Sequence, residues 1–413
     1  MSFSQALSGL SAQQQKLGAV GNNIANSQTV GFKSSNVQFA DVYAQSRIGL
    51  GTRVSGVLQD FSQGNIESTN RNMDLAIAGD GFFRFQQPSG EVGYSRNGQL
   101  TMTADGRLIN AQGAQIMGYA ADAEGNVQAG GDVTALAIDA GALPASATTA
   151  LSVQLNLDSG EEALDTAAFD PADANTYNFQ TNATIYDSQG NARTLTMYFI
   201  KDEGNVNQWA IQGRVNGGPA GATEYDDLDL GTLTFNQSGV LVTDGSQPVV
   251  LDAAFPDSEF GGANQFAELN VGLAFAGSTQ FADPSSVSDT TQNGYTAGSL
   301  VGVTIEDDGT VMRNYSNEES RAAGQIAMVS FRNPEGLSPV GDNLWTATGA
   351  SGQELVGAPG TGQRGLIESS AIETSNVDLA RELVDMIVSQ RAYQANSQTI
   401  STQDELLQTI INL

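Results

Sequence analysis

Cysteine and histidine are both absent from this chain of 413 residues. The first absence excludes disulfides, thiolate nucleophiles and cysteine metal sites, and the second removes the commonest general base and the commonest transition-metal ligand. Most hydrolase and metalloenzyme mechanisms are therefore closed to the chain. Chemistry based on aspartate or glutamate, or on an oxygen-ligated cation, stays open.

Positive charge is scarce, because Lys16, Lys33 and Lys201 are the only lysines and the formal net charge is −29. Nucleic acid and anionic lipid repel a surface of that sign, and no basic cluster offsets the repulsion. We therefore expect no nucleic-acid partner.

Long apolar runs are also missing. No stretch reaches the ~18 apolar residues of a membrane-spanning helix. The first residues, Met1 to Gln5, lack the positive and the continuous apolar regions of a cleaved signal peptide. The sequence predicts no membrane insertion, and either a cytoplasmic location or export without a cleaved signal.

Apolar residues recur at alternating steps of four and three near both ends of the chain, which places them on one stripe of a helix. This spacing predicts helices over residues 3–24 and 376–411, and Ser375 with Asp378 matches a capping box for the second helix. The candidate packing positions are Phe3, Leu7, Leu10, Leu17, Ile24, Leu379, Leu383, Met386, Ile387, Tyr393, Ile400, Leu407 and Ile411.

The first of these helices should be weak on its own. Lys16 is the only charge in residues 1–28, and Gly9, Gly18 and Gly21 each cost about 1 kcal/mol relative to alanine. One interpretation is that both are ordinary core helices of a soluble domain, which fits the periodicity equally well. The other, which the missing charges favour, is that they become ordered by packing on neighbours, including other copies of the chain.

Between the ends the apolar period changes to two, which indicates β-strands. Residues 75–77 and 83–85 predict a hairpin across residues 79–81, and Asp105-Gly106 predicts another tight turn. Alternating runs within residues 147–289 predict a second β domain. The expected fold is α+β and multidomain, with paired, coiled-coil-like terminal helices and two mainly antiparallel β domains nested between them.

Three patterns suggest chemistry, and each has a simpler explanation. Residues 360–365 spell G-x-G-x-x-G, but no strand leads into them and no helix follows at once, so a flexible linker explains them better than dinucleotide binding. The turn at residues 187–191 lacks the glutamate that completes an EF-hand, although a surface cation stays open. Among 46 acidic residues, pairs such as Glu161 and Glu162 are expected by chance. We assign no catalytic residue, cofactor or metal ligand.

Two terminal segments carry a recognisable pattern. Residues 22–33 resemble the N-terminal signature of the bacterial flagellar axial family, which comprises rod, hook and hook-junction proteins, and residues 375–379 with 386–394 are similar to its C-terminal signature. Within the family, residues 315–318 and 341–345 resemble the hook members most. The signature and linker positions are Asn22, Asn23, Asn26, Gly31, Phe32, Lys33, Ser375, Asn376 and Asp378. On physical grounds alone, the asparagines suit a helix end and Gly31 permits a positive φ.

The resemblance implies a structural subunit that assembles with its own copies into a curved helical tube, the flagellar hook. That tube would act as a universal joint for motor torque and as an export channel. The implied layout has four parts. These are residues 1–28 with 375–413 as a helical inner core, 29–72 with 358–374 as a linker, 73–146 with 290–357 as one β domain, and 147–289 as an outer β domain.

The implied partners are other copies of the chain, the distal rod protein, the hook cap protein, the hook-junction protein and the flagellar type III export gate. Phe39 and Tyr43 have the spacing of an export-recognition motif, a spacing that also arises by chance. The implied location is the extracellular flagellum, reached without a cleaved signal. The alternatives are a distal rod or hook-junction protein of the same family, a carbohydrate-binding β protein, and an acidic-residue hydrolase.

Overall fold

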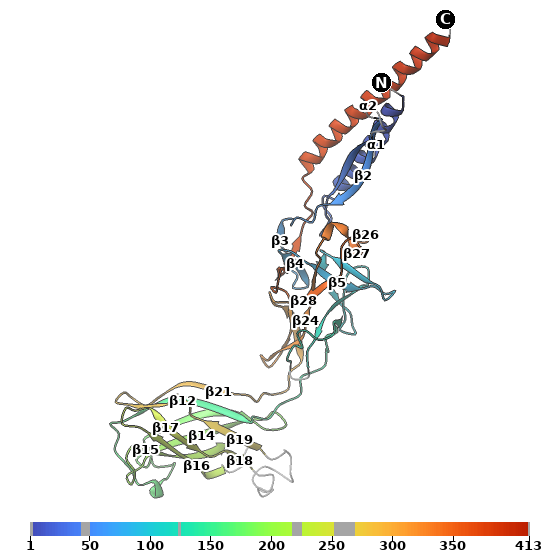
Figure 1. Cartoon of the computed structure of the whole chain (residues 1–413). Coiled ribbons are helices and arrows are strands. Elements are labelled where there is room, and N and C mark those ends of the chain that lie inside the picture. The colour runs from blue at the N-terminus through green and yellow to red at the C-terminus, as the bar shows by residue number, and fades with distance from the viewer. Residues whose placement is uncertain (1–2, 43–49, 123–124, 217–224, 252–268, 412–413) are drawn as a thin grey trace. The chain divides into compact units, whose positions relative to one another are not determined.

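The computed structural model describes residues 3–42, 50–122, 125–216, 225–251 and 269–411 (Figure 1). Two long helices, α1 (Phe3–Ala25) and α2 (Leu379–Ile411), enclose a succession of strands in the chain order. The chain divides into two compact units. The terminal unit comprises Met1–Ala140, Val301–Asn314 and Ser320–Leu413, and the central unit comprises Gly141–Leu300 and Tyr315–Glu319.

The two helices of the terminal unit lie side by side and antiparallel. Gly9 lies against Asn396, Lys16 Nζ lies 3.4 Å from Asp385 Oδ1, and Asn23 Nδ2 donates to Glu382 Oε1 at 2.9 Å. As the residue number increases along α1, the number of its neighbour on α2 decreases, so the two helices run in opposite directions. Figure 1 shows α2 continuing past the first turn of α1.

The start of α2 differs from the predicted capping box. Asp378 Oδ1 accepts hydrogen bonds from the backbone N–H groups of Ala380 at 3.0 Å and Arg381 at 3.2 Å, so Asp378 itself is the N-cap. Ser375 Oγ accepts from Val377 N before the helix begins. The predicted start at residue 376 was therefore early, because the aspartate caps the helix instead of occupying its first turn.

A long hairpin, β1 (Ser35–Val42) and β2 (Gly51–Gln59), contacts α1 in the region that the sequence interpretation treated as a linker. Its register runs from Ser35 opposite Gln59 to Val42 opposite Gly51. The alternation of Val37 and Phe39 is the sequence signal for it, and it is short enough to be overlooked.

The other strands of the terminal unit form one large sheet and two small ones. Their bounds are β3 (Ile66–Ser68), β4 (Asp74–Ala78), β5 (Phe82–Gln86), β6 (Val92–Ser95), β7 (Gly98–Gln99), β8 (Thr101–Met102), β9 (Leu108–Ile109), β10 (Gln115–Ala120), β11 (Thr134–Ala135), β22 (Leu300–Ile305), β23 (Thr310–Tyr315), β24 (Ser320–Ile326), β25 (Met328–Ser330), β26 (Ser338–Gly341), β27 (Leu344–Thr346), β28 (Leu355–Gly357), β29 (Leu366–Ser369) and β30 (Ala371–Glu373). The main path of the large sheet is β22-β23-β24-β10-β5-β6-β27-β26, and its core includes Phe83, Phe85 and Ile116.

The predicted hairpin between residues 75–77 and 83–85 was wrong. β4 pairs with β29 and β7, whereas β5 pairs with β6, β10 and β25 in another sheet. The physical reason is that β29 forms the backbone hydrogen bonds along one edge of β4, where Gly365 packs against Gly79. With β7 on its other edge, β4 has no edge left for β5. The turn at Asp105-Gly106 is confirmed, since β8 and β9 pair across it.

The central unit contains two sheets that share one core. The first has the order β18-β19-β12-β20, with β21 on β12, and the second is the meander β13-β14-β15-β16-β17. Their bounds are β12 (Ala150–Asp158), β13 (Phe179–Tyr186), β14 (Ala192–Lys201), β15 (Gln208–Asn216), β16 (Tyr225–Phe235), β17 (Leu241–Ser246), β18 (Val249–Leu251), β19 (Leu269–Ala274), β20 (Thr279–Phe281) and β21 (Ser286–Gln292). Leu155 from the first sheet and Phe199 and Trp209 from the second are fully buried in that core. β12 pairs in parallel with β19 and β20, so this unit is not purely antiparallel.

Candidate assembly surface

Helix α2 displays an apolar surface on the side that faces away from α1. Leu379, Leu383 and Ile387 follow one another at steps of four, and Val384 and Val388 lie beside them. Each of these five side chains is between 44% and 62% exposed. We call this set the α2 face.

The contact between α1 and α2 uses small and polar residues instead. On α2, Ser389 is buried and Asn396 lies against Gly9. On α1, Ala6, Ala12, Val20 and Asn23 are the buried residues. Because small and polar side chains contribute to this contact, the side chains of the α2 face are left without a covering element among the described residues.

The structure divides the predicted packing positions into two groups. Half-buried positions are Leu10, Leu17, Ile24, Met386 and Ile400. Exposed positions are Phe3, Leu7, Leu379, Leu383, Ile387, Tyr393 and Leu407. The side chain of Ile411 lies outside the described residues. Most of the predicted packing positions thus lie on the surface of the single chain, and fewer lie in contacts within it.

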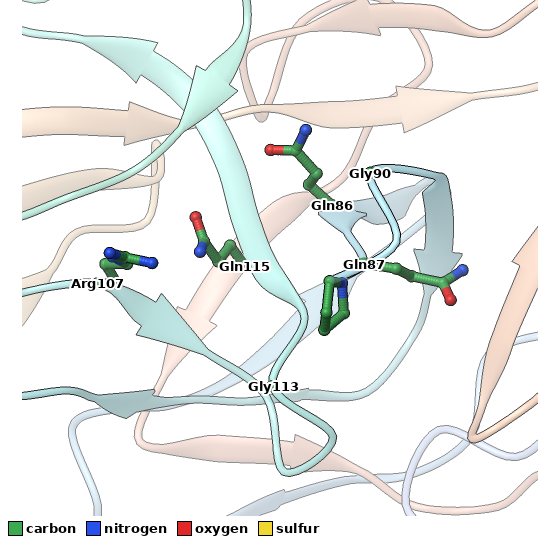
Figure 2. A pocket seen from close by; sticks show the side chains of 7 residues that line it. Gln86, Gln87, Gly90, Arg107, Gly113 and Gln115 are labelled. Atoms are coloured by element: carbon green, nitrogen blue, oxygen red, sulfur yellow. The ribbon is translucent and has the colours of Figure 1, made fainter.

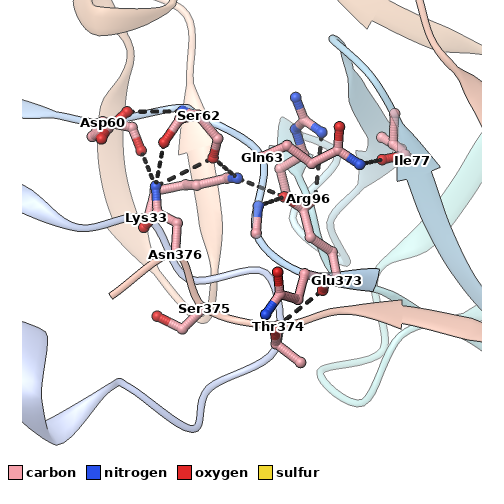
Figure 3. Close-up of polar contacts among 12 residues, drawn as sticks. Lys33, Asp60, Ser62, Gln63, Ile77, Arg96, Glu373, Thr374, Ser375 and Asn376 are labelled. Carbon is pink, nitrogen blue, oxygen red and sulfur yellow. Dashed lines mark hydrogen bonds and ion pairs between the residues drawn. The ribbon is translucent and has the colours of Figure 1, made fainter. Parts of the chain in front are cut away.

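Lys33 and Glu373 form a buried ion pair that joins the two ends of the chain (Figure 3). Lys33 Nζ lies 2.6 Å from Glu373 Oε1, and Arg96 Nη1 lies 3.3 Å from Glu373 Oε2, with all three side chains at most 2% exposed. Lys33 also donates to Ser62 O at 2.6 Å, and Glu373 Oε1 accepts from Gly64 N at 2.9 Å. We call this group the buried junction.

Burial lowers the pKa of Lys33, and repulsion from Arg96 acts in the same direction, while attraction to Glu373 opposes both. Removing one partner of such a pair leaves a buried charge uncompensated, which costs more than the pair gains. The buried junction is therefore sensitive to the loss of any member.

The remaining signature residues surround this junction. Asn376 Oδ1 accepts from Ser34 N at 2.8 Å and its amide donates to Asp60 O at 2.8 Å (Figure 3). Asn23 accepts from Ser35 N at 2.9 Å, so it ties α1 to the hairpin as well as to α2. Gly31 has φ 70° and a Cβ there would lie 2.7 Å from Asn97 N, so this position requires glycine.

The other signature positions form local turns. Asn26 N donates to Asn22 O at 3.1 Å, and Phe32 N donates to Thr29 O at 3.2 Å. Ser375 and Asp378 precede α2 as described above. Phe39 is 40% exposed on β1, and Tyr43 lies outside the described residues, so the export motif stays a prediction.

Sequence reasoning missed Arg96 and Glu373 as members of the buried junction. The available signal was Lys33 itself, because a lone lysine in a chain with so few needs a carboxylate when it is buried. That signal does not say which of the 46 acidic residues supplies it.

A shallow pocket of about 450 Å³ lies elsewhere on the terminal unit (Figure 2). Its lining consists of Gln86, Gln87, Pro88, Gly90, Arg107, Gly113 and Gln115. These residues supply amides and one guanidinium but no nucleophile and no carboxylate base. Among the described residues, no group of three or more acidic side chains could hold a metal ion, and no helix is long and apolar enough to cross a membrane.

Four family models match successive parts of the chain. They are the flagella basal body rod protein over residues 4–33, the flagellar hook protein FlgE/F/G D1 domain over 76–153, the flagellar basal body protein FlaE D2 domain over 156–295, and the flagellar basal body rod FlgEFG protein C-terminal region over 368–413.

Full-length relatives carry one name. The chain is 43% identical to the flagellar hook protein FlgE of Salmonella typhimurium, with 100% of both chains covered. It is 42% identical to that of Escherichia coli, again over 100% of both, and 33% identical to that of Borreliella burgdorferi over 100% of this chain and 99% of the relative.

A solved structure supports the fold independently. The crystal structure of Helicobacter pylori flagellar hook protein FlgE2 matches with a TM-score of 0.54 at 13% identity, covering 75% of this chain and 100% of that one. With relatives aligned from end to end, the chain belongs to the flagellar hook protein family.

Proposed function

We propose that the chain assembles with its own copies into the curved helical tube of the bacterial flagellar hook, which transmits motor torque and encloses an export channel. The observation that carries this proposal is the exposed α2 face. Contiguous apolar side chains on a soluble surface indicate an interaction site, and those of α2 have no covering element among the described residues.

In the proposed tube, the terminal helices occupy the smallest radius. Residues 1–28 and 375–413 form the inner core and pack in a coiled-coil-like manner against neighbouring copies. Residues 29–72 with 358–374 form the linker. Residues 73–146 with 290–357, and then 147–289, form two β domains at increasing radius. Contacts that repeat head to tail without closing generate such a tube.

The buried junction suits torque transmission. It ties Lys33, which follows α1, to Glu373, which precedes α2, and both to Arg96 of the β region. A fully buried and hydrogen-bonded ion pair holds its partners in one geometry. Twist applied to the helices is therefore passed to the β region without a flexible joint between them.

The remaining proposals concern location and partners. The tube belongs outside the cell, and the chain reaches it through the type III export gate without a cleaved signal, with Phe39 and Tyr43 as candidate recognition residues. The distal rod, hook cap and hook-junction proteins are the proposed neighbours. The shared name of the full-length relatives supports a hook protein over a rod or junction protein.

The central test replaces Leu383 by aspartate, because its side chain is 45% exposed on the α2 face. We expect Leu383→Asp to abolish tubes in negative-stain electron micrographs of purified chain while leaving its circular dichroism unchanged. Val206→Asp is the matched control, since Val206 is 89% exposed in the central unit. Normal tubes from Leu383→Asp would refute the role of the α2 face.

A second experiment tests the modular layout. Deleting residues 147–288 should leave tubes that still form but have altered curvature, because the inner-core contacts remain. Loss of both secretion and assembly would contradict the separation of inner core and outer domain.

A further inference from the structure

The β1–β2 hairpin carries a second set of exposed apolar side chains, which lie together on one of its faces. Val37, Phe39 and Asp41 alternate along one face of β1, and their register partners Val57, Val54 and Thr52 lie on the same face. Val37, at the start of this row, is buried at 8% exposed, whereas its partner Val57 and the side chains farther along β1 are exposed.

An irregularity in β2 creates this surface. The register shifts between Gln38, opposite Gly56, and Phe39, opposite Val54, so Ser55 is the extra residue of a β-bulge. Without the bulge, Val54 and Val57 would point to opposite faces, because they are three residues apart. With it, both lie on the same face as Phe39.

Beyond Val37, most of this row is exposed in the described chain, and Val54 is half-buried. Phe39 is 40% exposed and Val57 is 54% exposed, and Asp41 is exposed at the end of the same row. We call Phe39, Asp41, Val54 and Val57 the hairpin patch. A bulge that gathers exposed apolar side chains on one face indicates an interaction surface.

The α2 face offers a complementary surface. Arg391 is exposed four residues after Ile387 and three after Val388, so it lies one turn along the same side of the helix. Among the described residues, neither the Arg391 guanidinium nor the Asp41 carboxylate has a side-chain hydrogen bond or an ion pair. Two residues of strand and four residues of helix span similar lengths, about 6.6 Å and about 6 Å.

We infer that the hairpin patch binds the α2 face of a second copy of the chain, with Phe39 and Val57 against Ile387 and Val388, and with Asp41 accepting from Arg391. The inference rests on the proposed assembly and names one of its contacts. The two surfaces belong to different elements, so the contact is heterologous and leaves a free patch and a free α2 face at the ends of every oligomer.

Charge reversal tests the ion pair. We expect Asp41→Arg and Arg391→Asp each to raise the concentration of purified chain needed for half-maximal sedimentation by on the order of tenfold, through like-charge repulsion. The double variant Asp41→Arg/Arg391→Asp should recover most of that loss. Two single variants that assemble normally, or a double variant no better than either, would overturn the contact.

Engineered cysteines test the apolar part of the contact. Because the chain has no native cysteine, every disulfide that forms joins engineered residues. Chains carrying Phe39→Cys and Ile387→Cys should form a ladder of covalent dimers and larger species on oxidation of sedimented material. Val206→Cys with Ile387→Cys is the matched control and should form none. Sedimented Phe39→Cys/Ile387→Cys chains without a ladder would refute the contact while leaving assembly intact. Failure of the unaltered chain to sediment under any condition would instead refute the proposed assembly, and the contact with it.

Discussion

The central unit buries its large apolar side chains, whereas the terminal helices expose theirs. In the central unit Phe199, Trp209 and Phe275 are fully buried between two sheets. On α2, Leu383, Ile387 and Val388 are each at least 45% exposed, although they are as apolar as the core residues. The comparison teaches that the central unit covers its own apolar side chains, while the terminal helices leave an apolar surface for the proposed assembly to cover.

The same contrast appears in the contacts that each region does make. Two sheets of the central unit enclose a core of large side chains, so their packing gives stability directly. In the terminal helices the fully buried residues are small or polar, such as Ala12 and Ser389, and they bury little area. Substitutions should therefore affect stability in the first region and assembly in the second.

The largest expected effect on stability is in the central core. Phe199→Ala removes a side chain that is fully buried against Phe179 and Phe275, and should lower the free energy of unfolding of the central unit by about 3–5 kcal/mol. Trp209 is the only tryptophan there, so its fluorescence in urea, in a Trp345→Phe background, follows this unit.

Val206→Ala is the control, because an 89% exposed side chain should change stability by less than about 0.5 kcal/mol. Equal midpoints for Phe199→Ala and Val206→Ala would show that the central unit does not depend on its own core.

Next in size is the buried junction. Among the described residues, Lys33→Met leaves Glu373 with Arg96 as its only cation, and should destabilise the junction by about 3 kcal/mol. The backbone N–H groups of Gly31 and Gly64, which donate to Glu373, should then exchange with deuterium on the order of a hundredfold faster.

Lys16→Met provides the comparison, since the Lys16–Asp385 pair is partly exposed at 3.4 Å and should matter little. Unchanged protection at Gly31 and Gly64 in Lys33→Met would mean that the buried ion pair does not hold the segments together.

A smaller effect is expected on the stability of the central unit at acidic pH. Burial raises the pKa of Asp187, but hydrogen bonds from Asn191, Arg193 and Gln189 outweigh it and leave that pKa below its ordinary value. The folded carboxyl thus holds its proton more weakly than the unfolded one. Its stabilising contribution is complete above the ordinary pKa of about 4 and is lost as the pH falls through the lower folded pKa.

Asp187→Asn should therefore cost about 2 kcal/mol near neutral pH and flatten the loss of stability below about pH 4. The measurement is the urea midpoint of Trp209 fluorescence between pH 7 and pH 2. Asp283→Asn, at an exposed position of the central unit, is the control. An unchanged acid profile in Asp187→Asn would remove this carboxyl from the acid response.

The sequence predicted the elements better than their partners. Helical spacing located α1 and α2 to within a few residues, because it reports a local period. It could not show that Leu383 points away from α1 while Ser389 points toward it, since that choice depends on which side of α2 the other helix occupies. The predicted hairpin from residues 75 to 85 failed for a related reason, because β29, almost 300 residues later, pairs with β4.

The residues of the buried junction were also predicted only in part. Lys33 and Asn376 were singled out by resemblance to the family signatures, but Glu373 and Arg96 were not, because their pairing joins segments far apart in the sequence. The bulge at Ser55 leaves no clear mark in the sequence, since it is a matter of register between two strands.

The smallest predicted effect concerns the contact between α1 and α2. At Gly18 an added Cβ meets nothing within 4 Å, so Gly18→Ala should stabilise α1 in the unassembled chain by about 1 kcal/mol through helix propensity. At Gly9 the Cβ would lie 3.0 Å from Asn396 Nδ2, so the crowding should offset the same gain. Deuterium exchange of the α1 amides, below the concentration at which chains assemble, compares the two. Equal protection of α1 in Gly9→Ala and Gly18→Ala would show that Asn396 does not pack against Gly9. The proposed orientation of α2, with its small and polar residues toward α1 and the α2 face exposed, would then be wrong.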